Sequence, residues 1–329
     1  MFLAKELAWF LKSPPATMPA VRSAGTLMCL ASAVAFGAMA VFGKLAYEEG
    51  ATVGTVLAAR FTIAAAVFWA VGRPFRLTRR DTGIALALGA VGYAAQAGCY
   101  FAALQRIDAS LLSLFLYTFP AMVAVAAVAL GRERVDARRV LALVLASGGL
   151  ALVVAGAGPG TLDPLGVALA LGAAVVYATY ILVSDGVAGR VPALSLSALV
   201  CTGAAVTLVT GSWLVGDLRP GALSAEGWGW LACLALVSTV TAISLFFAGL
   251  RRVGPTTASI LSTVEPLVTV LLAFLVFGET LGPVQLLGGV FVLAAVLVLQ
   301  ARRREGSAAR RVLAGERAMS TPAGARSLP

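Results

Sequence analysis

The sequence predicts an all-α integral membrane protein whose ten transmembrane helices form two inverted five-helix repeats. Hydrophobic residues make up 60% of the 329 residues and charged residues only 12%, whereas a soluble domain has about 25% charged residues. The mean hydropathy is +0.94. The apolar residues fall into ten long runs, and two stretches of the chain are copies of each other. These three observations predict the fold class.

Each apolar run is close to the ~20 residues that a helix needs to cross about 30 Å of hydrocarbon. Short linkers that contain glycine, proline or charged residues separate the runs. In chain order, the predicted spans are 24–46, 52–71, 82–103, 108–130, 137–156, 165–184, 193–215, 228–249, 254–277 and 282–301.

The same pattern divides the chain into an N-terminal cytoplasmic segment (1–22), a first repeat (23–156), a second repeat (157–301) and a basic cytoplasmic tail (302–329). In the N-terminal segment, apolar residues recur at helical spacing, at Leu3, Leu7, Phe10 and Leu11. They predict either a short interfacial helix or a loosely ordered extension. The tail is rich in Arg, Ala, Gly and Ser, a composition typical of disorder.

Lys and Arg residues gather in alternate loops, as in membrane proteins whose cytoplasmic loops are basic. With the N-terminus inside, 21 of the 25 Lys and Arg residues fall on the cytoplasmic side. Only Arg106 and Arg219 fall in outer loops, while Lys44 and Arg60 lie within spans or at their ends. The sequence therefore predicts a multi-pass protein of a bacterial-type plasma (inner) membrane with both termini cytoplasmic. The net charge of +10 follows from this distribution and does not indicate nucleic-acid binding.

The internal duplication aligns residues 101–133 with residues 247–279 without a gap, at an offset of 146 positions. The identical pairs are Phe101, Ala102, Leu104, Arg106, Ser113, Pro120, Ala127 and Glu133 with Phe247, Ala248, Leu250, Arg252, Ser259, Pro266, Ala273 and Glu279. The copies occupy the fourth and ninth spans, which cross the membrane in opposite directions because they are five spans apart. Inverted repeats place a substrate site near the midplane and support alternating access in transporters. A duplicated scaffold without transport would share this symmetry.

Both copies carry a proline in mid-span, at Pro120 and Pro266. A proline lacks a backbone donor, so it frees a carbonyl group and bends the helix. We therefore expect both prolines to be bend points. Interrupted spans at matching positions of two halves indicate a transporter binding site.

The two copies differ where Glu265 stands in place of Phe119. An acidic residue in mid-membrane costs about 2.5–3.5 kcal/mol on insertion scales and is by default a functional candidate. Glu265 shares one helical face with Ser262 and Thr269. We interpret this face as the lining of a pathway in which Glu265 holds a substrate ammonium or carries a proton. The alternative is a buried partner for Arg60 or for the backbone groups freed by proline.

Arg60 lies about eight residues into the second span and must find an anion, a carbonyl group or water. It either binds a substrate carboxylate in a forked geometry, or it pairs with Glu265 or snorkels to the interface. Lys44 lies in the last turn of the first span, close to Glu48 and Glu49. We interpret Lys44 as a snorkelling side chain.

Polar and aromatic residues share single faces of several predicted helices. Such faces line cavities in which rings contact apolar groups and hydroxyls orient polar ones. Alternatively, tyrosines belong to the interfacial belt, which fits Tyr180 best, and Ser, Thr and Gln bond between helices. The predicted cavity-lining residues are Arg60, Tyr93, Gln96, Tyr100, Ser113, Tyr117, Tyr177, Thr241, Ser262 and Glu265.

The chain has no histidine, and its four cysteines (Cys29, Cys99, Cys201 and Cys233) lie in apolar runs without a CxxC pair. We expect no metal site and no disulfide framework. No Walker loop, HExxH or GxSxG motif occurs, which argues against ATP-driven transport, catalysis and a bound cofactor. The expected partners are a small-molecule substrate and the lipid bilayer. The expected assembly is a monomer or a homodimer.

Four apolar motifs carry a family resemblance: AFGAMAVFGKLA, AARFTIAAAV, FPAMVAVAAVALGRERV and PLVTVLLAFLVFGETLGPVQLLGGVFVLAAVLVL. Together they resemble the EamA-type permeases of the drug/metabolite transporter superfamily, over about residues 24–302. The resemblance implies two inverted five-helix repeats with helices 3, 4, 8 and 9 around a central cavity. It also implies export of amino acids, related metabolites or drugs. Pro120, Pro266, Glu133 and Glu279 match scaffold positions of the family.

The observations favour a secondary transporter that exports a small amphipathic metabolite by alternating access, above all an amino acid or a derivative. Glu265 and Arg60 would then bind the two ends of a zwitterion. The alternative is a proton-coupled exporter of drugs or toxic compounds, in which Glu265 exchanges protons inside an aromatic cavity. An enzyme or a sensor is disfavoured, because the sequence has no catalytic motif and no sizeable soluble domain.

Overall fold

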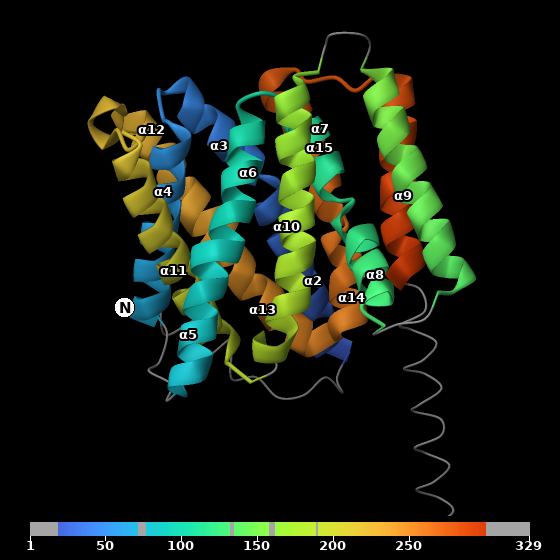
Figure 1. The fold of residues 1–329 in the computed structure, drawn as a ribbon, viewed down its shortest axis with the longest axis horizontal. Helices are drawn as coiled ribbons and strands as arrows, with labels where there is room; N and C mark the ends of the chain where they lie inside the picture. Colours follow the sequence, from blue (N-terminus) through green and yellow to red (C-terminus); the bar gives the residue numbers. More distant parts are fainter. Residues whose placement is uncertain (1–18, 72–76, 132–134, 158–161, 189, 301–329) are drawn as a thin grey trace, which may run out of the picture.

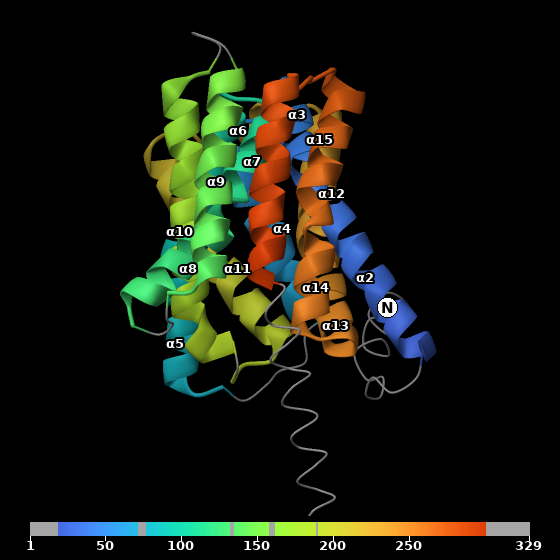
Figure 2. The ribbon, with the colours of Figure 1, turned by 90° about the vertical axis from the view of Figure 1, so that its right-hand side faces the viewer.

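The computed structural model describes residues 19–71, 77–131, 135–157, 162–188 and 190–300, and the regular structure within these ranges is helical. Within the described ranges, ten helices are long and apolar enough to cross a membrane, and they stand side by side as a bundle (Figures 1 and 2). The expected interfacial helix and the basic tail lie outside the described residues.

The first five spans contain eight helices and one π-helical turn. They are α2 (Pro19–Gly37) and α3 (Met39–Glu48); α4 (Val53–Val71); α5 (Arg79–Ala87), η1 (Leu88–Tyr93) and α6 (Ala94–Leu104); α7 (Ala109–Leu116) and α8 (Phe119–Ala129); and α9 (Ala137–Gly156).

The last five spans are built in a similar way, except that the sixth span is one continuous helix. They are α10 (Pro164–Ala188); α11 (Ala193–Leu214); α12 (Ala225–Ala235), η3 (Leu236–Thr241) and α13 (Ala242–Val253); α14 (Pro255–Ser262) and α15 (Val264–Phe277); and the helix Pro283–Gln300. A short 3₁₀ turn, η2 (Pro220–Ala222), precedes α12.

The spans lie close to their predicted positions, and two of the helix starts that differ are informative. Helix α2 begins at Pro19, so the last four residues of the predicted N-terminal segment extend the first span. The eighth span begins at Ala225 because Ser224 caps it: the Ser224 hydroxyl accepts a hydrogen bond from the Gly227 N–H at 3.0 Å. Capping chemistry sets that start, whereas hydropathy places it three residues later.

Large aromatic and aliphatic side chains are buried inside the bundle, and many other apolar side chains are exposed on its outside. Phe61, Phe68 and Phe115 are almost completely buried, while Val144 on α9 and Leu275 on α15 are exposed. An exposed apolar surface of this extent is unfavourable in water and favourable in hydrocarbon. The arrangement is that of a multi-pass membrane protein.

Among the described residues, four interrupted spans match between the two halves, while the break between α2 and α3 in the first span has no counterpart in the continuous α10. Spans 3 and 8 contain the π-helical turns η1 and η3, a feature that is frequent at functional segments. Span 4 breaks at Tyr117–Thr118 and span 9 at Thr263. Tyr117 and Thr263 are 146 positions apart, as in the sequence repeat, and a proline follows each of them by three residues.

The matching fourth and ninth spans run in opposite directions. The backbone N–H groups of Ala109 and Ser110, at the start of α7, donate hydrogen bonds to the Glu279 carboxylate at 3.1 and 3.0 Å. Glu279 follows the end of α15. The start of span 4 therefore lies beside the end of span 9.

Glycines allow the fifth and tenth spans to pack closely. A Cβ atom added at Gly149 would lie 2.6 Å from the Gly288 carbonyl oxygen, and one added at Gly288 would lie 2.6 Å from the Gly149 carbonyl oxygen. Figure 2 shows α9 and the last helix side by side. Close backbone approach of this kind is how helices associate in lipid.

Candidate functional site

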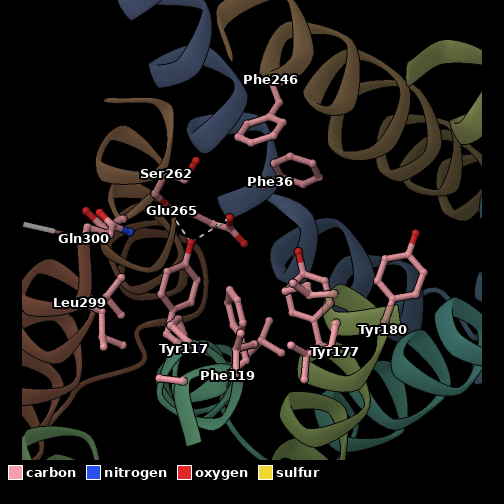
Figure 3. A pocket seen from close by; sticks show the side chains of 18 of the residues that line it. Phe36, Tyr117, Phe119, Tyr177, Tyr180, Phe246, Ser262, Glu265, Leu299 and Gln300 are labelled. Carbon is pink, nitrogen blue, oxygen red and sulfur yellow. Dashed lines mark hydrogen bonds between the residues drawn. The ribbon is translucent and has the colours of Figure 1, made fainter. Parts of the chain in front are cut away.

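A cavity of about 990 Å³ is lined by residues from both repeats. Tyr117, Ser262 and Glu265 line it next to the helix breaks of spans 4 and 9 (Figure 3). Arg139, near the start of α9, and Gln300, at the end of the last span, also line it. The cavity therefore extends from the middle of the membrane to the end of the bundle where the last span finishes.

The Tyr117 hydroxyl connects the broken helices of the two repeats. It lies 2.8 Å from the backbone carbonyl oxygen of Ser262 and 3.0 Å from Oε2 of Glu265. Pro266 cannot donate to the Ser262 carbonyl four residues earlier, because it has no N–H. Tyr117, from the first repeat, therefore supplies a donor to the carbonyl group that a proline frees in the second repeat (Figure 3).

Glu265 lies where three helix breaks meet. It occupies the first turn of α15, its side chain contacts Tyr117 at the break of span 4, and its backbone carbonyl faces the break between α2 and α3. A Cβ atom added at Gly37 would lie only 2.8 Å from the Glu265 carbonyl oxygen. The Thr269 hydroxyl donates to the Gly37 carbonyl at 3.0 Å. Glycine at position 37 thus permits α2 to approach α15.

A continuous aromatic wall leads from Tyr117 around the cavity. The ring centroids are 5.9 Å apart for Tyr117–Phe119, 4.6 Å for Phe119–Tyr177, 6.4 Å for Tyr177–Tyr180 and 5.9 Å for Tyr180–Tyr93. These separations are typical of interacting rings. Electron-rich ring faces beside a carboxyl group suit an ammonium or another organic cation.

Arg60 lies behind the Tyr93 end of this wall. Tyr93 meets Phe61 edge to face at 5.1 Å, and the Arg60 guanidinium stands 5.0 Å over the Phe61 ring and 5.4 Å over the Phe101 ring. Only 2% of Arg60 is exposed. Stacking against two buried rings partly offsets the cost of placing a cation in the membrane.

The Arg60 guanidinium also binds the π-helical turn of span 8. Its Nε donates to the Thr239 hydroxyl at 2.9 Å, and that hydroxyl donates to the Leu234 carbonyl at 3.0 Å. Within the part of the chain that the structure describes, no carboxylate lies within 4.0 Å of Arg60. Arg60 and Glu265 therefore do not form an ion pair.

At the opposite end of the bundle, Glu279 holds the start of span 4. Its carboxylate lies 2.5 Å from the Lys44 ammonium and accepts a hydrogen bond from the Ser110 hydroxyl at 2.9 Å. Asp108 lies 3.8 Å from the same ammonium. Lys44 is thus an ion-pair partner and not the snorkelling side chain predicted from its neighbours Glu48 and Glu49, because the fold brings the end of span 9 to it.

The pKa of the Glu279 carboxyl lies below its ordinary value. Burial alone raises this pKa, but hydrogen bonds from Lys44 and from the Ser110 and Ala109 N–H groups favour the charged form and outweigh burial. The Glu279 carboxylate also interacts favourably with the helix dipole at the start of α7. We call Lys44, Glu279 and the first turn of α7 the end lock.

Half of the predicted lining residues face the cavity: Tyr93, Tyr117, Tyr177, Ser262 and Glu265. The other half lie outside its wall: Arg60, Gln96, Tyr100, Ser113 and Thr241.

Local geometry explains why these five face elsewhere. The Ser113 hydroxyl donates to the Ser110 carbonyl of its own helix at 2.8 Å, and Tyr100 packs edge to face on Phe101 at 5.3 Å. Thr241 is exposed on the outer surface. It ends the π-helical turn η3, and such a turn changes the α-helical spacing from which shared faces are inferred. Gln96 is buried three residues after the matching turn η1.

The cavity contains five aromatic residues that sequence reasoning did not assign to it: Phe36, Phe119, Tyr180, Phe246 and Phe247. The assignment of Tyr180 to the interfacial belt was wrong, because its ring stacks between Tyr93 and Tyr177. The four phenylalanines have no polar side-chain atom, so a search for polar stripes cannot find them. One signal was available for Phe119, which aligns with Glu265 in the repeat.

The chain matches the sequence model of the EamA-like transporter family twice, over residues 23–155 and 164–300. It is similar to an uncharacterized transporter, YcbK, of Bacillus subtilis (strain 168), with 27% identity over 82% of this chain and 91% of that protein. An uncharacterized transporter of Archaeoglobus fulgidus is 30% identical over 60% of this chain and 70% of that protein. One solved crystal structure has a TM-score of 0.59 at 20% identity, covering 86% of this chain and 99% of that one. That likeness concerns the fold.

Proposed function

Because the chain belongs to the EamA-like transporter family, we propose that it is a secondary transporter for a small amphipathic metabolite with an ammonium group. An amino acid or a derivative is the preferred substrate. The family resemblance implies export across a bacterial-type plasma membrane, and the predicted repeat symmetry supports alternating access. The prolines after the breaks of spans 4 and 9 would be the bend points.

One observation carries the proposal: a carboxyl group lines a membrane cavity whose wall is aromatic. Glu265 is part of the lining together with Tyr117, Tyr177 and Phe119. An acidic group inside a membrane usually has a functional partner. An ammonium group would bind the Glu265 carboxylate and contact ring faces, while the apolar body of the substrate would pack on the remaining rings.

The position of Arg60 supports a zwitterionic substrate. Tyr93 and Tyr100 each lie within electrostatic range of both Arg60 and Glu265. Arg60 donates from Nε to Thr239 and also interacts with the Tyr93 phenol, and a guanidinium has further N–H donors that could bind a carboxylate. Reaching them would require Tyr93 to move aside during the transport cycle.

The test is counterflow of labelled substrates into proteoliposomes. The panel pairs amino acids with the matched amines that lack the carboxylate. We expect saturable counterflow of one amino-acid class, lost in Glu265→Gln and kept in Glu226→Gln, which changes an exposed acid on α12. Normal flux through folded Glu265→Gln protein would contradict the proposal.

A second candidate is a proton-coupled exporter of cationic drugs, which the cavity volume of about 990 Å³ favours. Pockets of roughly 300–1,000 Å³ hold drug-sized molecules, so an amino acid alone would leave much of this cavity filled by water. Efflux of a cationic dye that follows an imposed pH gradient, with no amino-acid counterflow, would support this candidate.

A further inference from the structure

The number of donors and acceptors around Tyr117 is informative. A phenol carries one hydrogen and can donate it to one acceptor at a time. Two acceptor oxygens lie within hydrogen-bonding distance of the Tyr117 hydroxyl, the Ser262 carbonyl at 2.8 Å and Oε2 of Glu265 at 3.0 Å. Both contacts are satisfied together only when a second hydrogen is present.

A proton on Glu265 supplies that second hydrogen. The neutral carboxyl group then donates to the Tyr117 oxygen, and the Tyr117 hydroxyl donates to the Ser262 carbonyl. Chains of this kind reinforce one another in a low-dielectric site. When Glu265 is charged, its carboxylate competes for the phenol hydrogen, because charge-assisted hydrogen bonds are stronger than neutral ones. The Ser262 carbonyl then loses its donor, which is costly inside a membrane.

We propose that Glu265 is a proton-binding site whose occupancy Tyr117 transmits to the helix break at Ser262. The inference rests on the proposed transport function and deepens it, because it names the proton as the second ligand of the same site. Proton binding favours the arrangement described above, in which the Tyr117 hydroxyl donates to the Ser262 carbonyl and so connects the two repeats. Proton release, or binding of a substrate ammonium in place of the proton, changes which acceptor the phenol serves. Tyr117 is in this view a positioning residue.

Among the described residues, no basic side chain forms an ion pair with Glu265, although Asp136, Arg138 and Arg139 line the same cavity. Helices α2, α3, α7 and α14 contact α15. Among the described side chains of these four helices, the charged ones are Lys44 and Glu48 on α3, and the Lys44 ammonium is bound to Glu279. Cys29 on α2 and Tyr47 on α3 are the other titratable groups there. From the cavity side, the phenols of Tyr93, Tyr100 and Tyr177 lie within electrostatic range of Glu265.

The first test is infrared difference spectroscopy of the protein in liposomes, without substrate, from about pH 5 to about pH 9. A neutral carboxylic acid has a C=O stretching band that its carboxylate lacks. We expect a titrating band that disappears in Glu265→Gln and shifts in frequency in Tyr117→Phe. Tyr47→Phe is the matched control, because it removes a phenol–carbonyl bond, to the Phe101 carbonyl at 2.9 Å, outside the cavity lining. An identical spectrum in Glu265→Gln, or an unshifted band in Tyr117→Phe, would overturn the proposal.

The second test uses Pro266→Ala, which restores a backbone N–H that can donate to the Ser262 carbonyl. The Tyr117 phenol is then free for the Glu265 carboxylate, so we expect the proton affinity of Glu265 to fall by about tenfold. In the Tyr117→Phe background, Pro266→Ala should change that affinity less than about threefold, because no phenol can be redistributed. An equal shift in both backgrounds would exclude Tyr117 as the relay.

These two tests measure the protonation of Glu265 and do not measure substrate transport. If no amino acid or amine of the counterflow panel is transported, the proposed substrate class is refuted. The infrared band of Glu265 and its shift in Tyr117→Phe would still be expected. Conversely, a carrier with a permanently charged Glu265 would transport but give no titrating band.

Discussion

Glu265 and Arg60 are both charged residues within spans, yet they have different environments. Glu265 lines the cavity and contacts a single side chain by a hydrogen bond, Tyr117. Arg60 lies between two phenylalanine rings and binds Thr239 in the π-helical turn. The acid faces the cavity, whereas the cation packs on buried rings and holds the π-helical turn. This difference leads to separate predictions for the two residues.

Replacing Glu265 with Gln should abolish charge-dependent binding while preserving shape. We expect the rate of counterflow at low substrate concentration to fall by roughly 10- to 100-fold, the range that loss of one charged hydrogen bond supports. The melting temperature should stay the same or rise, because a neutral group is easier to bury. Initial rates and thermal unfolding of the same purified samples provide the measurement. A lower melting temperature with unchanged rates would indicate a structural acid.

Replacing Arg60 with Lys keeps the charge but removes the planar group that stacks on two rings and binds Thr239. We expect a loss of about 1–3 kcal/mol of stability, the size of a hydrogen bond to a charged group. If Arg60 also binds the substrate carboxylate, the KM for an amino acid should rise while that for its decarboxylated amine stays constant. Equal changes for both substrates would assign Arg60 a structural role alone.

At the scale of single residues, the sequence identified polar side chains that are unusual within a span. It did not identify which way a side chain faces or which distant residue it contacts. Glu265, Tyr117 and Ser262 were found because polar groups are rare in an apolar span and share one helical face. Thr241 was misplaced because a π-helical turn shifts that face. Lys44 was misread because its partner, Glu279, is 235 residues away in the chain.

At the scale of helices, the packing of α9 against the last span can be tested with two neighbouring glycines. A Cβ at Gly149 would lie 2.6 Å from a backbone oxygen, whereas one at Gly148 would meet no atom within 4 Å. We expect Gly149→Ala to cost about 1–3 kcal/mol, the usual price of forcing an extra methyl group into a packed contact. Gly148→Ala should be neutral or slightly stabilising, because alanine favours helix. Thermal unfolding in detergent compares them, and equal melting temperatures would refute the contact.

The end lock can be tested at the same scale. Glu279→Gln weakens the contact with Lys44, so the start of α7 should separate from the end of α15 more often. A cysteine introduced at Ser113, which is buried one turn inside the lock, should then react faster with a membrane-impermeant thiol reagent, by roughly tenfold. The four native cysteines are replaced beforehand. The control is Glu48→Gln, which changes an exposed acid on α3. If the cysteine at position 113 also reacts faster in this control, loss of the end lock is not the cause.

For the molecule as a whole, the lock predicts a pH dependence with a definite sign. The pKa of Glu279 is lowered by its hydrogen bonds from an ordinary value of 4.5. Its contribution to the closed end is therefore complete above about pH 4.5 and is lost as the pH falls through the lowered pKa. The labelling difference between wild type and Glu279→Gln should persist at neutral pH and vanish in stronger acid. A difference that already vanishes near pH 7 would contradict this assignment.

The two ends of the bundle are not equivalent. One end is held by the end lock, and the cavity extends toward the other end, past Arg139 and Gln300. Alternating access would require the lock to open and the cavity end to close. The bridge from Tyr117 to Ser262 lies between these ends and joins the two repeats, so it is the point where a change at Glu265 can affect both.

The sequence by itself determined the membrane class, the ten spans, the repeat and the acidic residue beside the helix breaks, Glu265. These properties depend on hydropathy, residue identity and spacing, which are local along the chain. Only the tertiary structure decided which faces meet: that Tyr117 serves the Ser262 carbonyl, that Lys44 belongs to Glu279, and that phenylalanines complete the cavity wall. The physical reason is that apolar helix faces are nearly interchangeable in lipid. Their pairing is set by close packing and by hydrogen bonds between distant residues, and neither leaves a periodic signal in the sequence.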